Sequence, residues 1–165
     1  MGAPVITVRR GTEADIGAVD ALLQRSYPRQ LKADYPPSIM VTAVPILARA
    51  NPGLVSSGTY YVAVTDEGDV VGAGGWSRSI KRAGTADVRH LVTDDRHTRR
   101  GIGRRVMMGI VSEARLAGAN RLDCLATRTA QPFYEAMGFT VLGEMTIGLR
   151  PGIEFPVIRM QRKFA

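Results

Sequence analysis

The sequence predicts an α/β (α+β) fold in which helices cover a mixed central sheet. Segments of strand-like composition alternate with segments whose apolar residues recur at helical spacing. Glycines, prolines and acidic turn residues separate these segments. Hydrophobic residues make up 45% of the 165 positions, which is enough to fill one substantial core. We therefore expect one domain that spans residues 1–165.

The first half of the chain is predicted to contain a strand followed by two helices. Residues 5–10 alternate weakly between apolar and polar, as a strand does. Thr12 and Asp15 form a capping box for the next helix, which we expect to end at Tyr27 and Pro28. The apolar face of this helix consists of Ile16, Val19, Leu22 and Leu23. Residues 38–50 are predicted to form a second, irregular helix broken near Pro45.

A hairpin and a further strand follow. Residues 59–64 and 70–76 are β-branched, aromatic or small, and four turn-forming residues lie between them. The glycines at 72, 74 and 75 predict a bulge, or a close approach of another backbone, in the second strand. Residues 86–93 are predicted to form the next strand.

The second half begins with the clearest helix, which covers residues 101–117 and has apolar residues at helical spacing. Residues 122–126 form a short strand, and residues 129–137 form a short helix that stops at Gly138. The final strands are expected at residues 139–142 and 155–160, separated by a loop at 148–152. The resulting order is one strand, helices, three strands, a helix, a strand, a helix and two strands.

Composition limits the classes of function. No stretch approaches the roughly 18 uninterrupted apolar residues of a membrane span, so we expect no membrane partner. Residues 1–8 do not resemble a secretory signal, and a single cysteine fits a reducing compartment, which predicts a cytoplasmic protein. Cys124 stands between apolar neighbours and is predicted to be a buried, inert thiol. One cysteine also excludes a metal site built on several thiolates, and we predict no metal.

The net charge of +7 is concentrated rather than spread. A basic chain can bind nucleic acid, an anionic membrane or a phosphorylated ligand. Here five arginines flank one pair of glycines, which favours a compact polyanion and argues against nucleic acid. These arginines are Arg96, Arg99, Arg100, Arg104 and Arg105.

The segment around Gly101 and Gly103 stands where a strand leads into the strongest helix. The first N–H groups of a helix lack partners within it, and glycine allows the backbone to approach a phosphate closely. The segment lacks the Gly-Lys-Ser/Thr ending of a Walker A loop, and it is too short for the three-glycine dinucleotide fingerprint. A pyrophosphate fits such a helix start well.

Two segments resemble the landmarks of the GNAT superfamily of N-acetyltransferases. Residues 86–106 resemble its fourth strand, coenzyme A loop (Q/R-x-x-G-x-G/A) and following helix, and residues 127–139 resemble its short helix ending in F-Y-x-x-x-G-F. The sequence departs from the pattern at Thr98, where Gln or Arg is usual, and at Asp94 or Asp95, which replaces a frequent proline. The resemblance covers nearly the full chain. It implies a GNAT-like, mostly antiparallel central sheet of six to seven strands flanked by about four helices.

The resemblance also implies acetyl-CoA as co-substrate and assigns residues to its binding. The backbone of Leu91, Val92 and Thr93 would pair with the pantetheine arm like an added strand, and the N–H of Val92 would polarise the thioester carbonyl. Other expected binding residues at the pyrophosphate and along the coenzyme are Thr98, Arg99, Arg100, Gly101, Ile102, Gly103, Arg104 and Phe133. For Phe133, packing in the core is the favoured interpretation.

The expected reaction is direct attack of a primary amine on the thioester in a ternary complex. By resemblance, Tyr134 donates a proton to the departing thiolate, and phenol and thiol have reference pKa values close enough for this, about 10 and about 8.5. The amine must lose a proton, and Asp87 is the first candidate for the base, with His90 and Glu154 as alternatives. Each of these three residues has an exposed or ion-paired role as its alternative.

Three alternatives stay open at this point. A GNAT-like module that binds acyl-CoA as a sensor without turnover is the second hypothesis, although it would have no need of an acid at Tyr134. Trp76, Tyr27 and Tyr35 either line an acceptor pocket or fill the core. The acceptor is a small-molecule or peptide amine that the sequence does not identify, and a homodimer is one option for the assembly.

Overall fold

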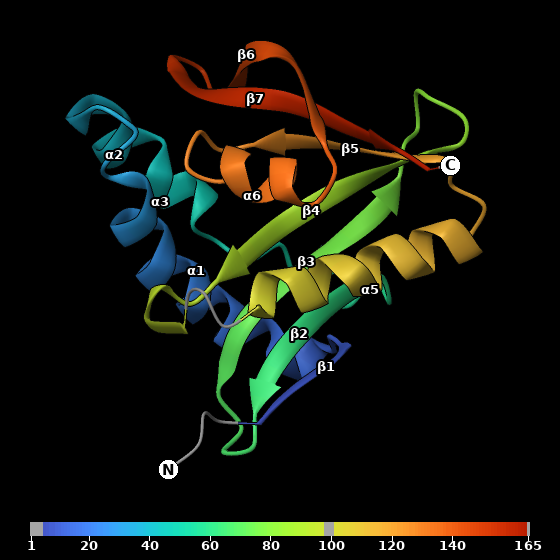
Figure 1. Ribbon diagram of the computed structural model, residues 1–165. Coiled ribbons are helices and arrows are strands. Elements are labelled where there is room, and N and C mark those ends of the chain that lie inside the picture. Colours follow the sequence, from blue (N-terminus) through green and yellow to red (C-terminus); the bar gives the residue numbers. More distant parts are fainter. Residues whose placement is uncertain (1–4, 98–100, 165) are drawn as a thin grey trace.

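The computed structural model describes residues 5–97 and 101–164, which form a seven-stranded mixed sheet covered by helices on both faces (Figure 1). The strand order is β1-β2-β3-β4-β5-β7-β6, and among the strands of the described residues only β4 and β5 pair in parallel. The strands are β1 (Ile6–Arg10), β2 (Tyr60–Thr65), β3 (Val70–Arg78), β4 (Thr85–Thr93), β5 (Arg121–Ala126), β6 (Thr140–Arg150) and β7 (Ile153–Lys163). The predicted fold class is confirmed.

Two layers of helices enclose the sheet. Helices α5 (Ile102–Leu116) and α6 (Gln131–Ala136) cover one face, where the apolar side of α5 packs on β3 and β4. Helix α1 (Ile16–Leu31) and the short helices α2 (Pro37–Thr42), α3 (Val44–Leu47) and α4 (Pro52–Val55) cover the other face. Two 3-10 turns, η1 (Glu13–Asp15) and η2 (Asp95–His97), precede α1 and α5. The apolar cores on the two faces of the sheet therefore both include side chains of the central strands.

Helix α1 begins as predicted but does not end as predicted. The N–H of Thr12 donates to the Asp15 carboxylate at 2.8 Å, which is the reciprocal bond of the expected capping box. The helix then continues through Pro28 to Leu31, three residues beyond the expected stop. Proline removes one helical hydrogen bond, but the last turn buries Leu31, and Gln30 donates to the Thr93 carbonyl at 2.5 Å. These tertiary contacts offset the lost bond.

The segment after α1 is helical, but its interruption differs from the prediction. Helix α2 ends at Thr42, Ala43 separates it from α3, and Pro45 lies in the first turn of α3. Proline is well tolerated there, because the first N–H groups of a helix have no intrahelical acceptor. Helix α4, which Asn51 caps through its side chain, was not anticipated.

The glycines of β3 allow the close approach that the sequence predicts. A Cβ on Gly75 would lie 2.7 Å from the Tyr60 Cα, and one on Gly74 would lie 2.5 Å from a Leu91 methyl group. The register between β3 and β4 also shifts here, so that His90 and Leu91 lie opposite the single residue Gly74. The extra residue of this shift belongs to β4. The bulge that the sequence predicts in β3 lies at Val71, beside Gly72, where the register between β2 and β3 shifts.

The last two strands are longer than predicted. Strand β6 runs to Arg150 and β7 starts at Ile153, so the expected loop at 148–152 is reduced to the tight turn at Pro151 and Gly152. Gly152 has a φ of 77°, a conformation that favours glycine. The extension was hidden in the sequence because most of β6 is exposed and lacks the apolar alternation of a half-buried strand.

Candidate active site

A large cleft opens where β4 and β5 separate. The two strands pair only from Thr85 to Asp87 on β4, opposite Arg121 to Asp123 on β5, although both strands continue further. Figure 1 shows them diverging from this point. The cleft has a volume of about 1060 Å³ and is lined by β4, β5, α6, the start of α5, parts of α1 and the β6–β7 hairpin. This volume lies at the upper end of the usual range for small-molecule and cofactor pockets, about 300–1,000 Å³.

The cleft-facing edge of β4 beyond Asp87 has no β5 partner among the described pairings. The bulge at His90 and Leu91 changes which side chains point to each face. Val88 packs with α5, whereas Val92, four residues later, packs with the α1 cluster, so the bulge reverses the usual alternation. Leu91, Val92 and Thr93 all line the cleft.

Helix α5 begins at the same cleft. Gly101 is the N-cap of the helix and has a φ of 72°. The residues of the helix start that line the cleft are Gly101, Ile102, Gly103 and Arg104. A Cβ on Gly103 would lie 3.2 Å from both the Phe133 ring and the Thr93 hydroxyl. The helix start is therefore closely packed against β4 and α6. Thr98, Arg99 and Arg100 lie outside the described residues.

The described arginines of the basic cluster point to different places. Arg104 lines the cleft. Arg96 instead binds the carboxylate of Asp94, and Arg105 donates to the Ile6 carbonyl at 2.6 Å, away from the cleft. The prediction that these arginines all gather at one polyanion is therefore wrong for Arg96 and Arg105. Each of the two has a hydrogen-bond partner elsewhere in the fold.

Asp94 organises the start of the loop between β4 and α5. Its side chain is fully buried, accepts hydrogen bonds from Arg25 at 2.7 Å and from Arg96 at 2.9–3.2 Å, and lies 3.8 Å from His97. Burial alone would raise the pKa of Asp94, but the hydrogen bonds and charges of Arg96 and Arg25 outweigh it and lower the pKa. The carboxylate therefore stays ionised.

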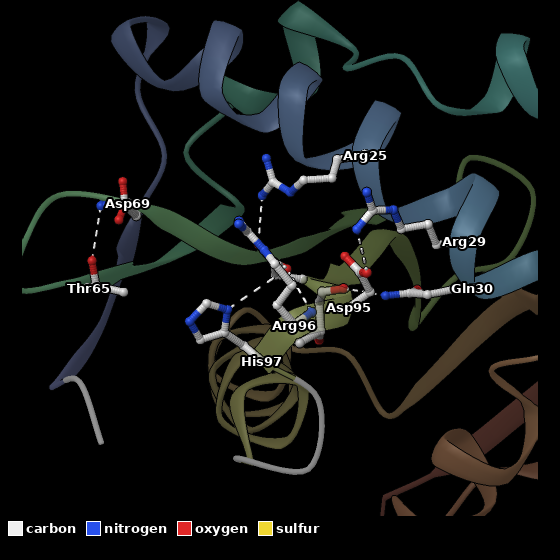
Figure 2. A network of polar contacts seen from close by, with 10 residues as sticks. Arg25, Arg29, Gln30, Thr65, Asp69, Asp95, Arg96 and His97 are labelled. Carbon is white, nitrogen blue, oxygen red and sulfur yellow. Dashed lines mark hydrogen bonds and ion pairs between the residues drawn. The ribbon is translucent and has the colours of Figure 1, made fainter. Parts of the chain in front are cut away.

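Figure 2 shows that α1 supplies further contacts to this loop. Arg29 donates to Asp95 at 3.3 Å, and Gln30 holds the end of β4 through the Thr93 carbonyl. The network thus fixes the end of β4 and the beginning of the loop to α1. Sequence reasoning noted Asp94 and Asp95 only as replacements for proline. Their partners on α1 are more than sixty residues away, and nothing in the sequence pairs them.

Tyr134 stands on α6 and reaches the cleft. Its ring is buried and makes edge-to-face contacts with Phe133 at 5.5 Å and Phe139 at 5.2 Å between ring centroids. Burial raises the pKa of the Tyr134 phenol well above its usual value, with further contributions from Cys124 and Tyr27. The phenol therefore keeps its proton at neutral pH, but the raised pKa makes it a weaker acid than a free phenol and widens the gap from the pKa of a thiol. Phe133 is partly buried against the same core and also lines the cleft.

Asp87 is the last residue of β4 that pairs with β5, where it lies opposite Asp123. Both residues line the cleft. Burial and the Asp123 charge raise the pKa of Asp87, and Arg89 and Arg82 oppose this rise. Asp123 is itself held by Arg82 at 3.1 Å and Gln161 at 2.7 Å. An aspartate whose pKa is raised binds a proton more readily than an exposed one, as a base requires.

The alternative candidates are placed differently. His90 lines the cleft, has an unusual φ of 46°, and has its pKa lowered by burial and by Arg89. Glu154 is exposed and outside the cleft lining. Tyr27 lines the cleft, with its pKa raised to about 12 by burial, whereas Trp76 and Tyr35 do not line it. Trp76 donates to the Tyr61 hydroxyl, and Tyr35 stacks on Phe155, so both are core residues.

Cys124 is buried on β5 beside Tyr134, and burial raises the pKa of its thiol to about 12. The thiol is therefore a poor nucleophile, as predicted. Within residues 5–97 and 101–164, no group of three or more histidine, cysteine or acidic side chains is arranged to hold a metal ion. In the same part of the chain, no helix has the length and apolar character of a membrane span.

Comparisons with known proteins identify the family. The family model described as "Acetyltransferase (GNAT) domain" matches residues 42–161. No curated protein sequence matches significantly. Among solved structures, the PaiA N-acetyltransferase from Thermoplasma acidophilum in complex with coenzyme A is similar, with a TM-score of 0.74 and 15% identity over 97% of this chain and 99% of that one.

Two further structures show the same likeness. A GNAT-family acetyltransferase from Staphylococcus aureus Mu50 has a TM-score of 0.71 and 13% identity, over 98% of this chain and 100% of that one. N-acetylglutamate synthase from Neisseria gonorrhoeae, complexed with coenzyme A and L-arginine, has a TM-score of 0.65 and 17% identity, over 98% of this chain and 34% of that one. The chain belongs to the GNAT acetyltransferase family.

Proposed function

We propose that the chain is an N-acetyltransferase that moves the acetyl group of acetyl-CoA to a primary amine of a small molecule or peptide. The observation that carries this proposal is the single cleft that holds the start of α5, the unpaired edge of β4, Tyr134 and Asp87. In this proposal one domain performs the whole reaction in the cytoplasm. Coenzyme-bound relatives of the same fold support acetyl-CoA as donor.

The coenzyme would be held mainly by backbone groups. Its pyrophosphate would lie at the free N–H groups of the α5 start, where Gly101 and Gly103 leave room and Arg104 adds positive charge. Thr98, Arg99 and Arg100 complete the binding loop in this proposal. The pantetheine arm would pair with Leu91, Val92 and Thr93, in the way a peptide adds to a sheet edge. Phe133 would contact the arm beside Gly103.

The reaction would proceed by direct attack. The amine nitrogen forms a bond to the thioester carbon, and a backbone N–H on the cleft-facing edge of β4 stabilises the resulting oxyanion. The N–H of Val92 is not that donor, because the register of β4 against β3 turns it toward Ala73. The proton that the amine loses passes to Asp87, directly or through water. The carbon–sulfur bond then breaks, and the Tyr134 hydroxyl gives its proton to the leaving thiolate. Solvent restores the proton of Tyr134 and removes that of Asp87, so that no covalent enzyme intermediate forms.

An amine-panel assay tests this proposal. Purified protein is incubated with acetyl-CoA and single amines, including amino acids, polyamines, aminoglycosides and peptide N-termini, and the release of free thiol is followed. We expect release above the background hydrolysis rate with at least one amine, and an acetylated product by mass spectrometry. Saturable binding of acetyl-CoA without acetylation of any amine would instead favour a non-catalytic acyl-CoA-binding module.

A further inference from the structure

The part of the cleft around Asp87 carries more positive than negative charge. The cations that line the cleft away from the α5 start are Lys81, Arg82, Arg89 and Arg159. The described carboxylates that line it are those of Asp87 and Asp123. The surplus is unexpected for an enzyme whose acceptor is an amine, because an ammonium group would be repelled by it.

The cations differ in how well they are neutralised. Arg82 lies 3.1 Å and Arg159 lies 3.9 Å from the same Asp123 carboxylate. Arg89 donates to the Ser77 hydroxyl at 3.1 Å, and among the described residues no carboxylate lies within ion-pair distance of its guanidinium. The charge of Arg89 is therefore available to a ligand in the cleft.

Arg89 and Asp87 present opposite charges on one face of one strand. They are two residues apart on β4 before the bulge, so their side chains point to the same side of the sheet. Their Cα atoms are about 7 Å apart. A ligand with an amine and a carboxylate on adjacent carbons or on one carbon can meet both groups at once, because the long arginine side chain can bend toward it.

Building on the proposed function, we infer that the acceptor is an amine that carries a carboxylate close to the nitrogen, as a free amino acid does. Arg89 binds the carboxylate through two parallel N–H···O bonds, and this orients the nitrogen toward Asp87. Lys81, which also lines the cleft, adds attraction for the carboxylate. Polyamines and aminoglycosides, which bring several positive charges and no carboxylate, are disfavoured by the same cations.

The experiment compares matched acceptors on the wild-type protein. The twenty common amino acids are each assayed beside their carboxamides, which keep the amine and side chain but lose the negative charge. For the best acid, we expect a kcat/KM at least tenfold above that of its amide, mainly through a lower KM. Equal values for acid and amide would overturn the inference while leaving acetyl transfer intact. Acetylation of no amine at all would overturn both.

Variants assign the preference to Arg89. Arg89→Gln should bring the ratio of acid to amide close to one, Arg89→Lys should keep part of it, and both should bind acetyl-CoA as the parent does. Arg150→Gln is the matched control, since it removes an exposed arginine outside the cleft lining and should keep the full ratio. An unchanged ratio in folded Arg89→Gln would contradict the inference.

Discussion

At the scale of single residues, two side chains combine position in the cleft with an altered proton affinity. Burial holds the Tyr134 phenol in its protonated form, and burial with Asp123 makes the Asp87 carboxylate a better proton acceptor. One group therefore retains a proton to give, and the other accepts one more readily. Opposite requirements of this kind are what an acyl transfer to an amine imposes on its acid and base.

Tyr134→Phe tests the acid. The change removes one hydroxyl and keeps the ring that packs against Phe133 and Phe139. We expect kcat to fall by about 10²- to 10⁴-fold, the usual contribution of a general acid, with the Kd for acetyl-CoA nearly unchanged. Steady-state kinetics and calorimetry measure the two quantities. A kcat equal to that of the parent would remove Tyr134 from the mechanism.

Asp87→Asn tests the base through the pH profile. Asp87 must be ionised to accept a proton, so activity should decline as the pH falls through its pKa. Burial and the Asp123 charge raise the pKa of Asp87, and Arg89 and Arg82 oppose this rise without cancelling it. Activity should therefore decline at a pH above the usual pKa range of an aspartate. In Asp87→Asn we expect a much lower kcat/KM and no such acidic limb. An identical acidic limb in the variant would assign it to another group, with His90 as the first candidate.

At the scale of elements, the start of α5 sets the coenzyme site. Gly101 is held in a left-handed conformation that costs other residues about 1–2 kcal/mol, and more for a β-branched side chain. Gly101→Val should therefore shift the first helical N–H groups and cover them, and we expect the Kd for acetyl-CoA to rise at least tenfold. Calorimetry with folded protein measures this.

Gly109→Ala is the matched control on the same helix. A Cβ at Gly109 meets no atom within 4 Å, and its φ is that of an ordinary helix residue. The substitution should raise the free energy of unfolding by about 0.5–1 kcal/mol and leave the affinity for acetyl-CoA unchanged. A similar loss of affinity in both variants would mean that α5 as a whole, rather than its first turn, responds to substitution.

The contact between α1 and the β4–α5 loop depends on Asp94. The folded pKa of Asp94 is lowered, so the stability that the network contributes is fully present above the unfolded pKa of about 3.9. This stability declines as the pH falls below that value and is lost as the pH falls through the lower folded pKa. Asp94→Ala should lower the free energy of unfolding by about 2–3 kcal/mol at pH 7, and by a smaller amount at pH 3, where the unfolded state already binds the proton and the folded state does not. Urea unfolding at both pH values measures this. An equal loss at both would indicate a packing effect instead of an ionic one.

At the scale of the whole molecule, the order of helices and strands along the chain follows from local sequence patterns. The hairpin, the long helix that starts beside Gly101 and the bulge beside Gly72 are each predicted by residues close together in the sequence, and each is confirmed. Asp87, Leu91, Gly103 and Tyr134 were selected by resemblance, and all of them line one cleft.

The errors share a physical cause, because each depends on contacts between distant segments. Helix α1 continues beyond Pro28 because Leu31 is buried in the core and Gln30 donates to the Thr93 carbonyl. Strand β6 extends to Arg150 through pairing with β7, although its own residues are mostly exposed. Arg96 binds the Asp94 carboxylate and Arg105 binds the Ile6 carbonyl, so neither side chain points to the cleft as the clustering in sequence had suggested.

Binding of acetyl-CoA is the most direct test of the account, because every proposed role depends on that ligand occupying the cleft between β4 and β5. Acetyl-CoA is titrated into the protein by calorimetry at low and at high salt. We predict saturable binding of one molecule per chain, weakened by salt because the pyrophosphate meets positive charge at the start of α5. Absence of binding by the folded protein at millimolar acetyl-CoA would contradict the account.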